Sequence, residues 1–112
     1  MNDDDREEIR ARFDDAVNLT PKELEDWLKT DESKAVGWGK EEGGESVGHE
    51  SGRRIVSIKR KKKDELDDDD YQHMRKVTGY VHRHLKQSGP DDDKQHSKWR
   101  YSLMNWGHDP CK

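Results

Sequence analysis

The feature that most constrains the fold is the stretch Leu66–Gln87, LDDDDYQHMRKVTGYVHRHLKQ. Its apolar residues recur three and four positions apart over about four turns, the spacing of one buried helix face. Asp67 can cap the helix, and the acids at 68–70 lie where the positive end of the helix dipole favours carboxylates. Gly89-Pro90 stops the pattern. The sequence therefore predicts a long, half-buried helix over residues 67–87. Its buried face would comprise Tyr71, Met74, Val77, Thr78, Val81 and Leu85.

Two shorter helices are predicted upstream of this stretch. Residues 1–17 form the first, with about five frayed residues at its start. Thr20 is a predicted N-cap for the second, since Pro21 suits the first helical position and Glu23 can complete a capping box. The segment from Thr30 to Ser33 either ends that helix or caps another turn. The inward faces would be Ile9, Phe13 and Val17 in the first helix and Leu24, Trp27 and Leu28 in the second.

Glycine and proline divide the rest of the chain. The glycine-rich stretch 37–50 is predicted to be a loop, and a helix is predicted from about Ser51 because Ile55, Val56 and Ile58 cluster on one side. A polar linker is predicted over 88–96. A short C-terminal helix would carry Trp99, Leu103 and Trp106 on one face, with Gly107 as its C-terminal cap.

These elements predict one compact all-α domain over residues 1–112, with four to five helices centred on 67–87. Only 27% of the residues are hydrophobic and 43% are charged, so the core is small and the outer helix faces are highly charged. No alternating strand pattern occurs. The predicted core consists of Trp27, Leu28, Ile55, Ile58, Met74, Val77, Val81, Leu85, Trp99, Leu103 and Trp106.

Charge is distributed unevenly along the chain. Residues 53–63 contain seven basic side chains and no acidic one, whereas residues 1–50 carry a net charge of -9 and residues 64–70 of -6. Such a basic segment can contact several phosphates, and each contact releases a counterion. We therefore predict a small protein that binds nucleic acid, DNA in the first place, with low sequence specificity. The predicted contact residues are Arg53, Arg54, Lys59, Arg60, Lys61, Lys62, Lys63, Arg75, Lys76 and Arg83.

Two other interpretations of the basic segment stay open. Six acids follow it directly, so its cations can be solvated and neutralised by surface ion pairs, each of which contributes little. Alternatively, the charged face and the 37–50 loop form a surface for a protein partner, and the protein is then an interaction or regulatory module without a nucleic-acid role.

Several strings in the chain resemble one known family. They are TPKELEDWL, TDES, VGW, GESVGHESGRRIV, DDDYQHMRKVTGYVHRHL and WRYSLMNWGHDP. In this order, over about residues 13–112, they are similar to the domain of unknown function 3140 family of small microbial proteins. The resemblance implies a single domain over nearly the whole chain, and some family members carry a provisional DNA-binding label. The chain departs from the family pattern in the linker at 86–96 and at Cys111, where an apolar residue is expected.

No motif in the sequence specifies a reaction. Gly44-Glu45-Ser46-Val47-Gly48 spells the G-x-S-x-G pattern of a hydrolase, but no strand precedes it and the chain is too short for the parallel sheet that the motif requires. His82 and His84 point to nearly opposite sides of a helix and cannot share a metal ion. His108 and Cys111 lack further ligands. We predict no catalytic residue, no metal site and no cofactor.

The single Cys111 fits a reducing compartment. The charged run Asp3–Glu8 stands where a signal peptide would be apolar, and no apolar run reaches membrane-spanning length. The expected location is the cytoplasm, or the nucleus if the source is eukaryotic, with no membrane partner.

Overall fold

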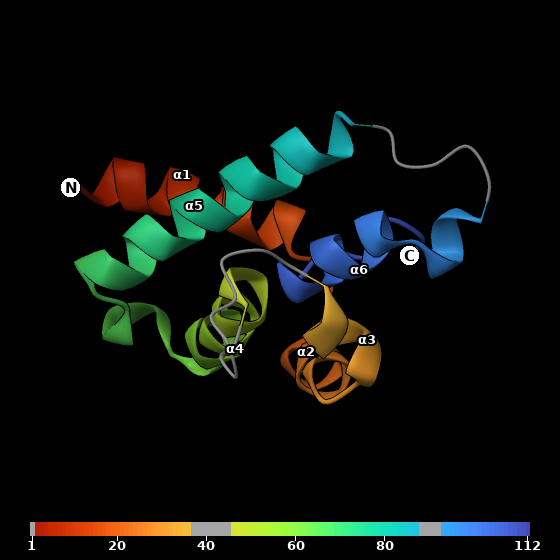
Figure 1. Ribbon diagram of the computed structural model, residues 1–112. Coiled ribbons are helices and arrows are strands. Elements are labelled where there is room, and N and C mark those ends of the chain that lie inside the picture. Colours follow the sequence, from red (N-terminus) through yellow and green to blue (C-terminus); the bar gives the residue numbers. More distant parts are fainter. Residues whose placement is uncertain (1, 37–45, 88–92) are drawn as a thin grey trace.

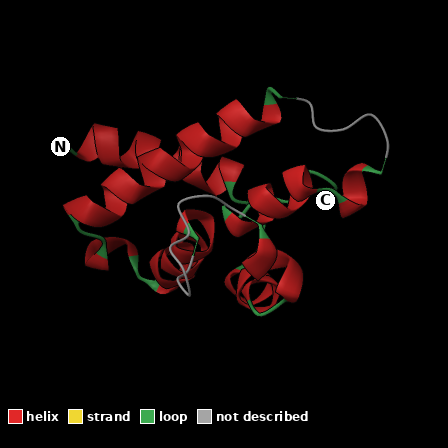
Figure 2. Ribbon diagram, in the orientation of Figure 1, coloured by secondary structure: helices red, strands yellow, loops and turns green. Residues whose placement is uncertain are grey.

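The computed structural model describes residues 2–36, 46–87 and 93–112, and its described parts contain helices and no strand (Figures 1 and 2). The all-α prediction is confirmed. The α-helices are α1 (Asp3–Ala16), α2 (Pro21–Leu28), α3 (Asp31–Ala35), α4 (Val47–Arg60), α5 (Asp68–Leu85) and α6 (Lys98–Asn105), and two single 3-10 turns, η1 (Lys63–Glu65) and η2 (Lys94–His96), precede α5 and α6. The five-residue α3 is the element beyond the four or five helices predicted.

The helix starts follow the capping signals of the sequence. Asp67 Oδ1 accepts a hydrogen bond from the Asp70 N–H at 2.8 Å, and the Asp70 carboxylate accepts one from the Asp67 N–H at 3.2 Å, which makes a reciprocal capping box. Thr20 and Glu23 form the predicted box at α2. Thr30 accepts from the Ser33 N–H and caps α3, so the segment 30–33 begins a new turn and is not merely the end of α2.

The end of α6 also follows its sequence signal. Gly107 has a φ of +83°, the left-handed conformation that glycine adopts without a Cβ penalty. Its N–H donates to the Met104 carbonyl at 2.9 Å, and the His108 N–H donates to the Leu103 carbonyl at 3.0 Å. This pair of bonds is a Schellman motif. Gly107 lies against Val17, and its carbonyl accepts from the Leu19 N–H, so the end of α6 is fixed to the α1–α2 connection.

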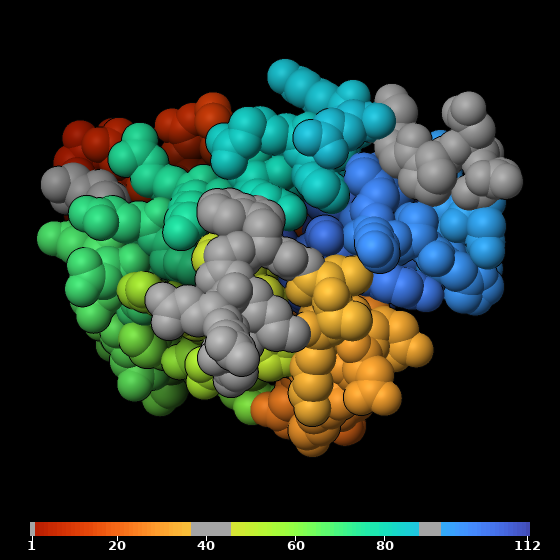
Figure 3. All heavy atoms as spheres, viewed as in Figure 1, coloured from red at the N-terminus to blue at the C-terminus, as the bar shows by residue number. Residues whose placement is uncertain are grey.

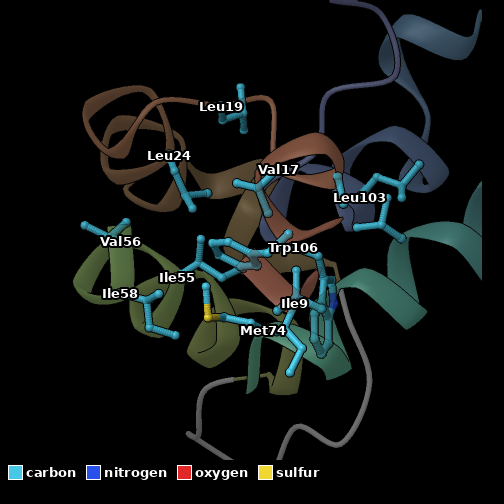
Figure 4. Packing of buried hydrophobic residues seen from close by; sticks show 14 of the residues in the cluster. Ile9, Val17, Leu19, Leu24, Ile55, Val56, Ile58, Met74, Leu103 and Trp106 are labelled. Atoms are coloured by element: carbon cyan, nitrogen blue, oxygen red, sulfur yellow. The ribbon is translucent and has the colours of Figure 1, made fainter. Parts of the chain in front are cut away.

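The helices form two groups around one core. α1 and α5 lie against each other and begin at the same end of the molecule, where Arg6 contacts Asp68 at 2.8 Å (Figure 1). α2, α3 and α6 lie together on the other side, and α4 packs mainly on α2. Their apolar faces meet in a continuous core (Figure 4). The core accounts for the single domain, since five of the helices contribute to it.

The predicted core is largely confirmed. Trp27, Leu85 and Trp99 are only partly buried and pack at its margin, whereas the other eight predicted residues are buried. Phe13 and Tyr71, two of the largest fully buried side chains, were predicted as helix-face residues but not as members of this core. The other buried apolar residues outside the predicted core are Ile9, Ala16, Val17, Leu19, Leu24, Val36 and Val56.

The start of α4 corrects one prediction. Ser46 caps this helix and Val47–Glu50 are helical, although the sequence predicts a loop through residue 50. Gly48 and Gly52 permit close packing of α4 against α6 and its C-terminal end. An added Cβ would lie 3.0 Å from Trp106 Nε1 at position 48 and 2.6 Å from the Asn105 carbonyl oxygen at position 52. Residues 37–45 of the predicted loop lie outside the described residues.

The structure also differs from the prediction in two polar segments, the start of α1 and the linker before α6. Asn2 accepts from the Asp5 N–H at 2.8 Å and α1 begins at Asp3, where fraying is predicted through residue 5. Within the predicted linker 88–96, residues 94–96 form the turn η2, and 88–92 lie outside the described residues. In the described ranges, no helix is both long and apolar enough to cross a membrane.

Candidate nucleic-acid interface

The basic segment begins on the outer face of α4. Because this helix buries Ile55 and Ile58, its residues 53, 54 and 60 face away from the core. The Arg54 side chain is 45% exposed and that of Arg60 is 51% exposed. The first half of the segment therefore presents arginines at the surface, as predicted.

Three of the predicted contact residues are engaged inside the molecule. Lys59 Nζ donates to the carbonyls of Val17 and Leu19 at 3.3 and 3.4 Å. Burial lowers the pKa of Lys59, and the nearby Asp14 opposes this effect. Lys59 thus holds the α1–α2 connection, an arrangement that disfavours a phosphate contact.

Arg60 and Lys61 form ion pairs with other helices. Arg60 Nη1 lies 2.7 Å from Glu25 on α2, in an exposed pair. Lys61 Nζ lies 2.7 Å from the Asp70 carboxylate, whose side chain is only 7% exposed. The hydrogen bond to Asp70 raises the pKa of Lys61, and partial burial opposes it. The interpretation of internal neutralisation therefore holds for these two cations.

Asp70 is shared between α4 and the segment that follows it. Besides Lys61, Arg54 Nη2 lies 4.0 Å from Asp70 Oδ1. Burial alone would raise the pKa of Asp70, but the hydrogen bonds from Lys61 and from the Asp67 N–H, with the charges of Lys61 and Arg54, lower it below its ordinary value. Asp70 thus caps α5 and also forms ion pairs with two cations near the start of this helix.

The cations of α5 separate onto two sides of the helix. Lys76 lines a shallow depression of about 310 Å³ together with Arg54, Asp69, Gln72 and His73. Arg75 instead lines a groove of about 340 Å³ between α5 and α1. Other residues of that groove are Asp5, Glu8, Ile9, Arg12, Thr78, Gly79 and His82. The fold brings Lys76 to the basic segment and takes Arg75 away from it.

Arg83 and the remaining lysines complete the predicted set. Arg83 is exposed near the end of α5, and its Nη1 lies above Gly79. Lys62 and Lys63 are exposed beside the start of α5, and neither has a carboxylate within 4.0 Å among the described residues. Arg53 is exposed and borders a groove of about 370 Å³ between α2 and α4.

Among the described residues, Trp106 lies near this surface but is not free to stack on bases. Trp106 is 2% exposed and is stacked with Tyr80 at a centroid distance of 4.2 Å and with His73 at 6.4 Å. His73 also shares a 2.9 Å hydrogen bond with Ser51. Burial lowers the pKa of His73 to about 4, with Arg54 and Lys76 acting in the same direction. His73 is thus neutral at pH 7 and borders the core.

The other motifs keep structural roles. Ser46 of the G-x-S-x-G string is 2% exposed and caps α4 by accepting from the His49 N–H; Gly44 and Glu45 lie outside the described residues. His108 binds the Ala16 carbonyl, and Cys111 is an exposed free thiol. In the parts that the structure describes, no three His, Cys, Asp or Glu side chains gather closely enough to hold a metal ion.

Two cations beside the basic segment were not predicted from the sequence. Arg6 and Arg10 of α1 approach Tyr71, close to Lys62 and Lys63. Their spacing of four residues places them on one helix face, which was a usable signal. The strongly acidic composition of residues 1–50 concealed it.

The comparison with protein families covers most of the chain. Residues 12–104 match the family model described as "Protein of unknown function (DUF3140)". The chain belongs to the DUF3140 family. The resemblance found in the sequence is therefore confirmed, and the matched range runs from α1 into α6, including the whole basic segment. Comparisons of this DUF3140 protein with curated proteins and with solved structures gave no match.

Proposed function

We propose that this protein binds nucleic acid, in the first place duplex DNA, through phosphate contacts with little sequence specificity. The contacts belong to a surface that we term the basic edge, formed by Arg54, Lys61, Lys62, Lys63 and Lys76. One observation carries the proposal: after internal pairing, cations from α4, the 61–63 segment and α5 still border one another. Arg54 and Lys61 meet at Asp70, and Arg54 and Lys76 line the same depression.

The basic edge suits phosphates more than bases. Phosphate oxygens are recognised by charge and N–H donors, and such contacts fix position without reading sequence. With Trp106 buried, stacking on bases has no support at this surface. Phosphate contact therefore supplies the affinity, and the affinity should depend steeply on salt.

The test is fluorescence anisotropy of a labelled random-sequence duplex, titrated with the protein at increasing salt. We expect micromolar binding that weakens steeply as salt rises. The variant Lys62→Glu/Lys63→Glu/Lys76→Glu should weaken binding at least about tenfold and reduce the salt slope, because each lost phosphate contact releases one counterion fewer. It leaves Arg60 and Lys61 with their carboxylate partners, so reduced binding is not confused with unfolding.

A control with two Lys→Glu changes instead of three uses lysines far from the basic edge. Lys94→Glu/Lys98→Glu changes exposed side chains beside α6, at the other side of the molecule from the start of α5 (Figures 1 and 3). It should reduce affinity by less than about twofold, since charges beyond a Debye length are screened. Equal losses in both variants would mean that net charge, and not this surface, governs binding.

A protein partner is the second candidate function. It is favoured by the acids that lie among the cations, with Asp69 in the Lys76 depression and Asp67 and Asp68 at the start of α5. A surface of mixed charge suits a complementary protein surface better than a uniform polyanion. Lack of DNA binding even at low salt would leave this candidate in first place.

A further inference from the structure

A second cationic feature lies where the first turns of α1 face the segment that follows α4. These elements enclose a cleft of about 630 Å³. The cleft joins residues more than fifty positions apart in the sequence. It is lined by Asp3, Arg6, Glu7, Arg10, Lys62, Lys63, Asp64 and Tyr71.

Tyr71 organises the two arginines of the cleft. The guanidinium carbon of Arg6 lies 5.1 Å from the centre of the Tyr71 ring, and that of Arg10 lies 6.0 Å from it. Arg10 Nη1 also donates to the Tyr71 hydroxyl at 2.7 Å. Because Tyr71 is 2% exposed and fixed in the core, it gives both arginines a rigid support. Two planar guanidinium groups are thus held against the same ring.

Both arginines keep unused donors. Arg6 donates from Nη2 to Asp68, which leaves its Nη1 for a ligand; its Nε also has no partner but is buried. Arg10 has the Tyr71 hydroxyl and no carboxylate within 4.0 Å in the described part of the chain. A guanidinium group has five N–H donors arranged as a fork that matches phosphate oxygens. Lys62 and Lys63 add two point charges from the facing wall.

We infer that this cleft holds one phosphate group, with the guanidinium groups of Arg6 and Arg10 on one side and the ammonium groups of Lys62 and Lys63 on the other. Where the phosphate belongs to bound DNA, the inference rests on the proposed function. Lys62 and Lys63 then belong to both surfaces, and the cleft extends the basic edge onto α1. A free phosphorylated compound offers the same chemistry from another source.

Three carboxylates of the cleft limit the affinity. Asp3, Glu7 and Asp64 are exposed and oppose the four cations. The balance favours one phosphate in the cleft over two, because a second negative charge there would meet one of these acids. Neutralising one of these acids should therefore strengthen binding, whereas neutralising one of the arginines should weaken it.

The experiment uses the full chain and two probes, the random-sequence duplex and inorganic phosphate. Arg10→Gln should weaken duplex binding about tenfold at low salt, and Glu7→Gln should strengthen it about threefold, as expected for charges next to a bound phosphate. Lys98→Gln and Glu32→Gln are exposed, remote substitutions with the same changes in net charge, and each should alter affinity by less than about twofold. Circular dichroism and urea unfolding test whether Arg10→Gln remains folded. If Arg10→Gln is unfolded, Glu7→Gln still tests the cleft, because it changes only an exposed side chain.

Inorganic phosphate distinguishes the sources. In a nuclear magnetic resonance titration, it should shift the Nε–Hε signals of Arg6 and Arg10, and Glu7→Gln should increase the phosphate affinity. Phosphate shifts without any duplex binding would support the cleft as a site for a free phosphate and reject the proposed function. Duplex binding that responds to Lys62→Glu/Lys63→Glu/Lys76→Glu, but to neither Glu7→Gln nor Arg10→Gln, would overturn the cleft and leave the proposed function. Neither duplex binding nor phosphate shifts would overturn both.

Discussion

Two buried polar groups, Asn105 and Asp70, hold the helices together by different means. Asn105 is 0% exposed and all its contacts are neutral. Its Oδ1 accepts from Trp27 Nε1 at 2.8 Å and from the Ser33 hydroxyl, and its Nδ2 donates to the Ser33 carbonyl at 3.1 Å. One side chain on α6 thereby connects α2 and α3.

Asp70 is 5% exposed and its partners are charged. Lys61 and Arg54 approach its carboxylate at 2.7 and 4.0 Å, and the Asp67 N–H completes the cap. Both cations remain partly exposed, so solvent and salt screen these pairs.

The difference between the two residues shows at which of them a substitution should affect both stability and binding. The Asn105 network depends on geometry alone, and its contribution is independent of pH and salt. The Asp70 pairs depend on both, and a bound phosphate would compete with Asp70 for the same cations. We therefore expect substitutions at Asn105 to affect folding only, and substitutions at Asp70 to affect both folding and polyanion binding.

The largest expected effect is that of Asn105→Ala. It removes three hydrogen bonds and leaves the buried Ser33 hydroxyl and the Trp27 N–H without partners, which should cost about 3 kcal/mol or more of unfolding free energy. Urea unfolding measures the loss, which should be equal at pH 5 and pH 8. Ser57→Ala, at an exposed position of α4, is the control and should change stability by less than about 0.5 kcal/mol. A small loss at Asn105 would mean that the network adds little.

Gly52→Ala tests the packing behind Asn105. The new Cβ would lie 2.6 Å from the Asn105 carbonyl oxygen and 2.7 Å from Leu28, so α4 and α6 must separate, at a cost of about 2 kcal/mol. Gly79→Ala is the matched substitution in α5, where only the end of the Arg83 side chain is near, at 3.2 Å. It should stabilise the protein by about 0.5–1 kcal/mol, because alanine favours a helix interior. Thermal unfolding of the two variants should give shifts of opposite sign; equal shifts would refute the packing role.

Asp70→Asn should have the smallest effect and the only one of the three that depends on pH. Because the pKa of Asp70 is lowered in the folded protein, its contribution is present above the unfolded pKa, near 3.8, and is lost as pH falls through the folded pKa. At pH 7 the variant should lose about 1 kcal/mol, and the difference from the wild type should shrink towards pH 3. Urea unfolding across this range measures it.

The same variant also tests the link to function. Asp70→Asn leaves Lys61 and Arg54 without their carboxylate, so duplex affinity should rise while stability falls. His73, whose pKa is lowered to about 4, contributes its own loss of stability between about pH 6.5 and 4. Most of that loss is common to both proteins; the Asp70 charge raises the pKa of His73, so its removal makes the loss slightly larger in the variant. A constant stability difference from pH 7 to pH 3 would contradict the assignment to Asp70.

Features with a local cause were predictable from the sequence. The start of α5 follows from Asp67 and the helical spacing behind it, and the end of α6 follows from Gly107, because capping involves residues within one turn. The all-α class follows from the same signals repeated along the chain.

Features with a distant cause were not predictable in this way. Gly48 was assigned to a loop and Gly52 to the first turn of a helix, and only the position of α6 shows that both glycines permit close packing inside one helix. Lys59 was assigned to the surface because its carbonyl partners lie about forty residues away. At the candidate site, the sequence indicated a basic segment but neither its partial neutralisation by Asp70 nor the contribution of Arg10.

The contacts of α6 have a consequence for synthesis on the ribosome. Trp27 and Asn105 are 78 positions apart, and Asn18 and Asp109 are 91 apart. The helices α2, α3 and α4 therefore leave the ribosome before α6, which contacts all three, has been synthesised. Helices can form early, whereas the domain can close only after α6 has been synthesised. Until then, the apolar faces of the unfinished chain are available to chaperones and proteases.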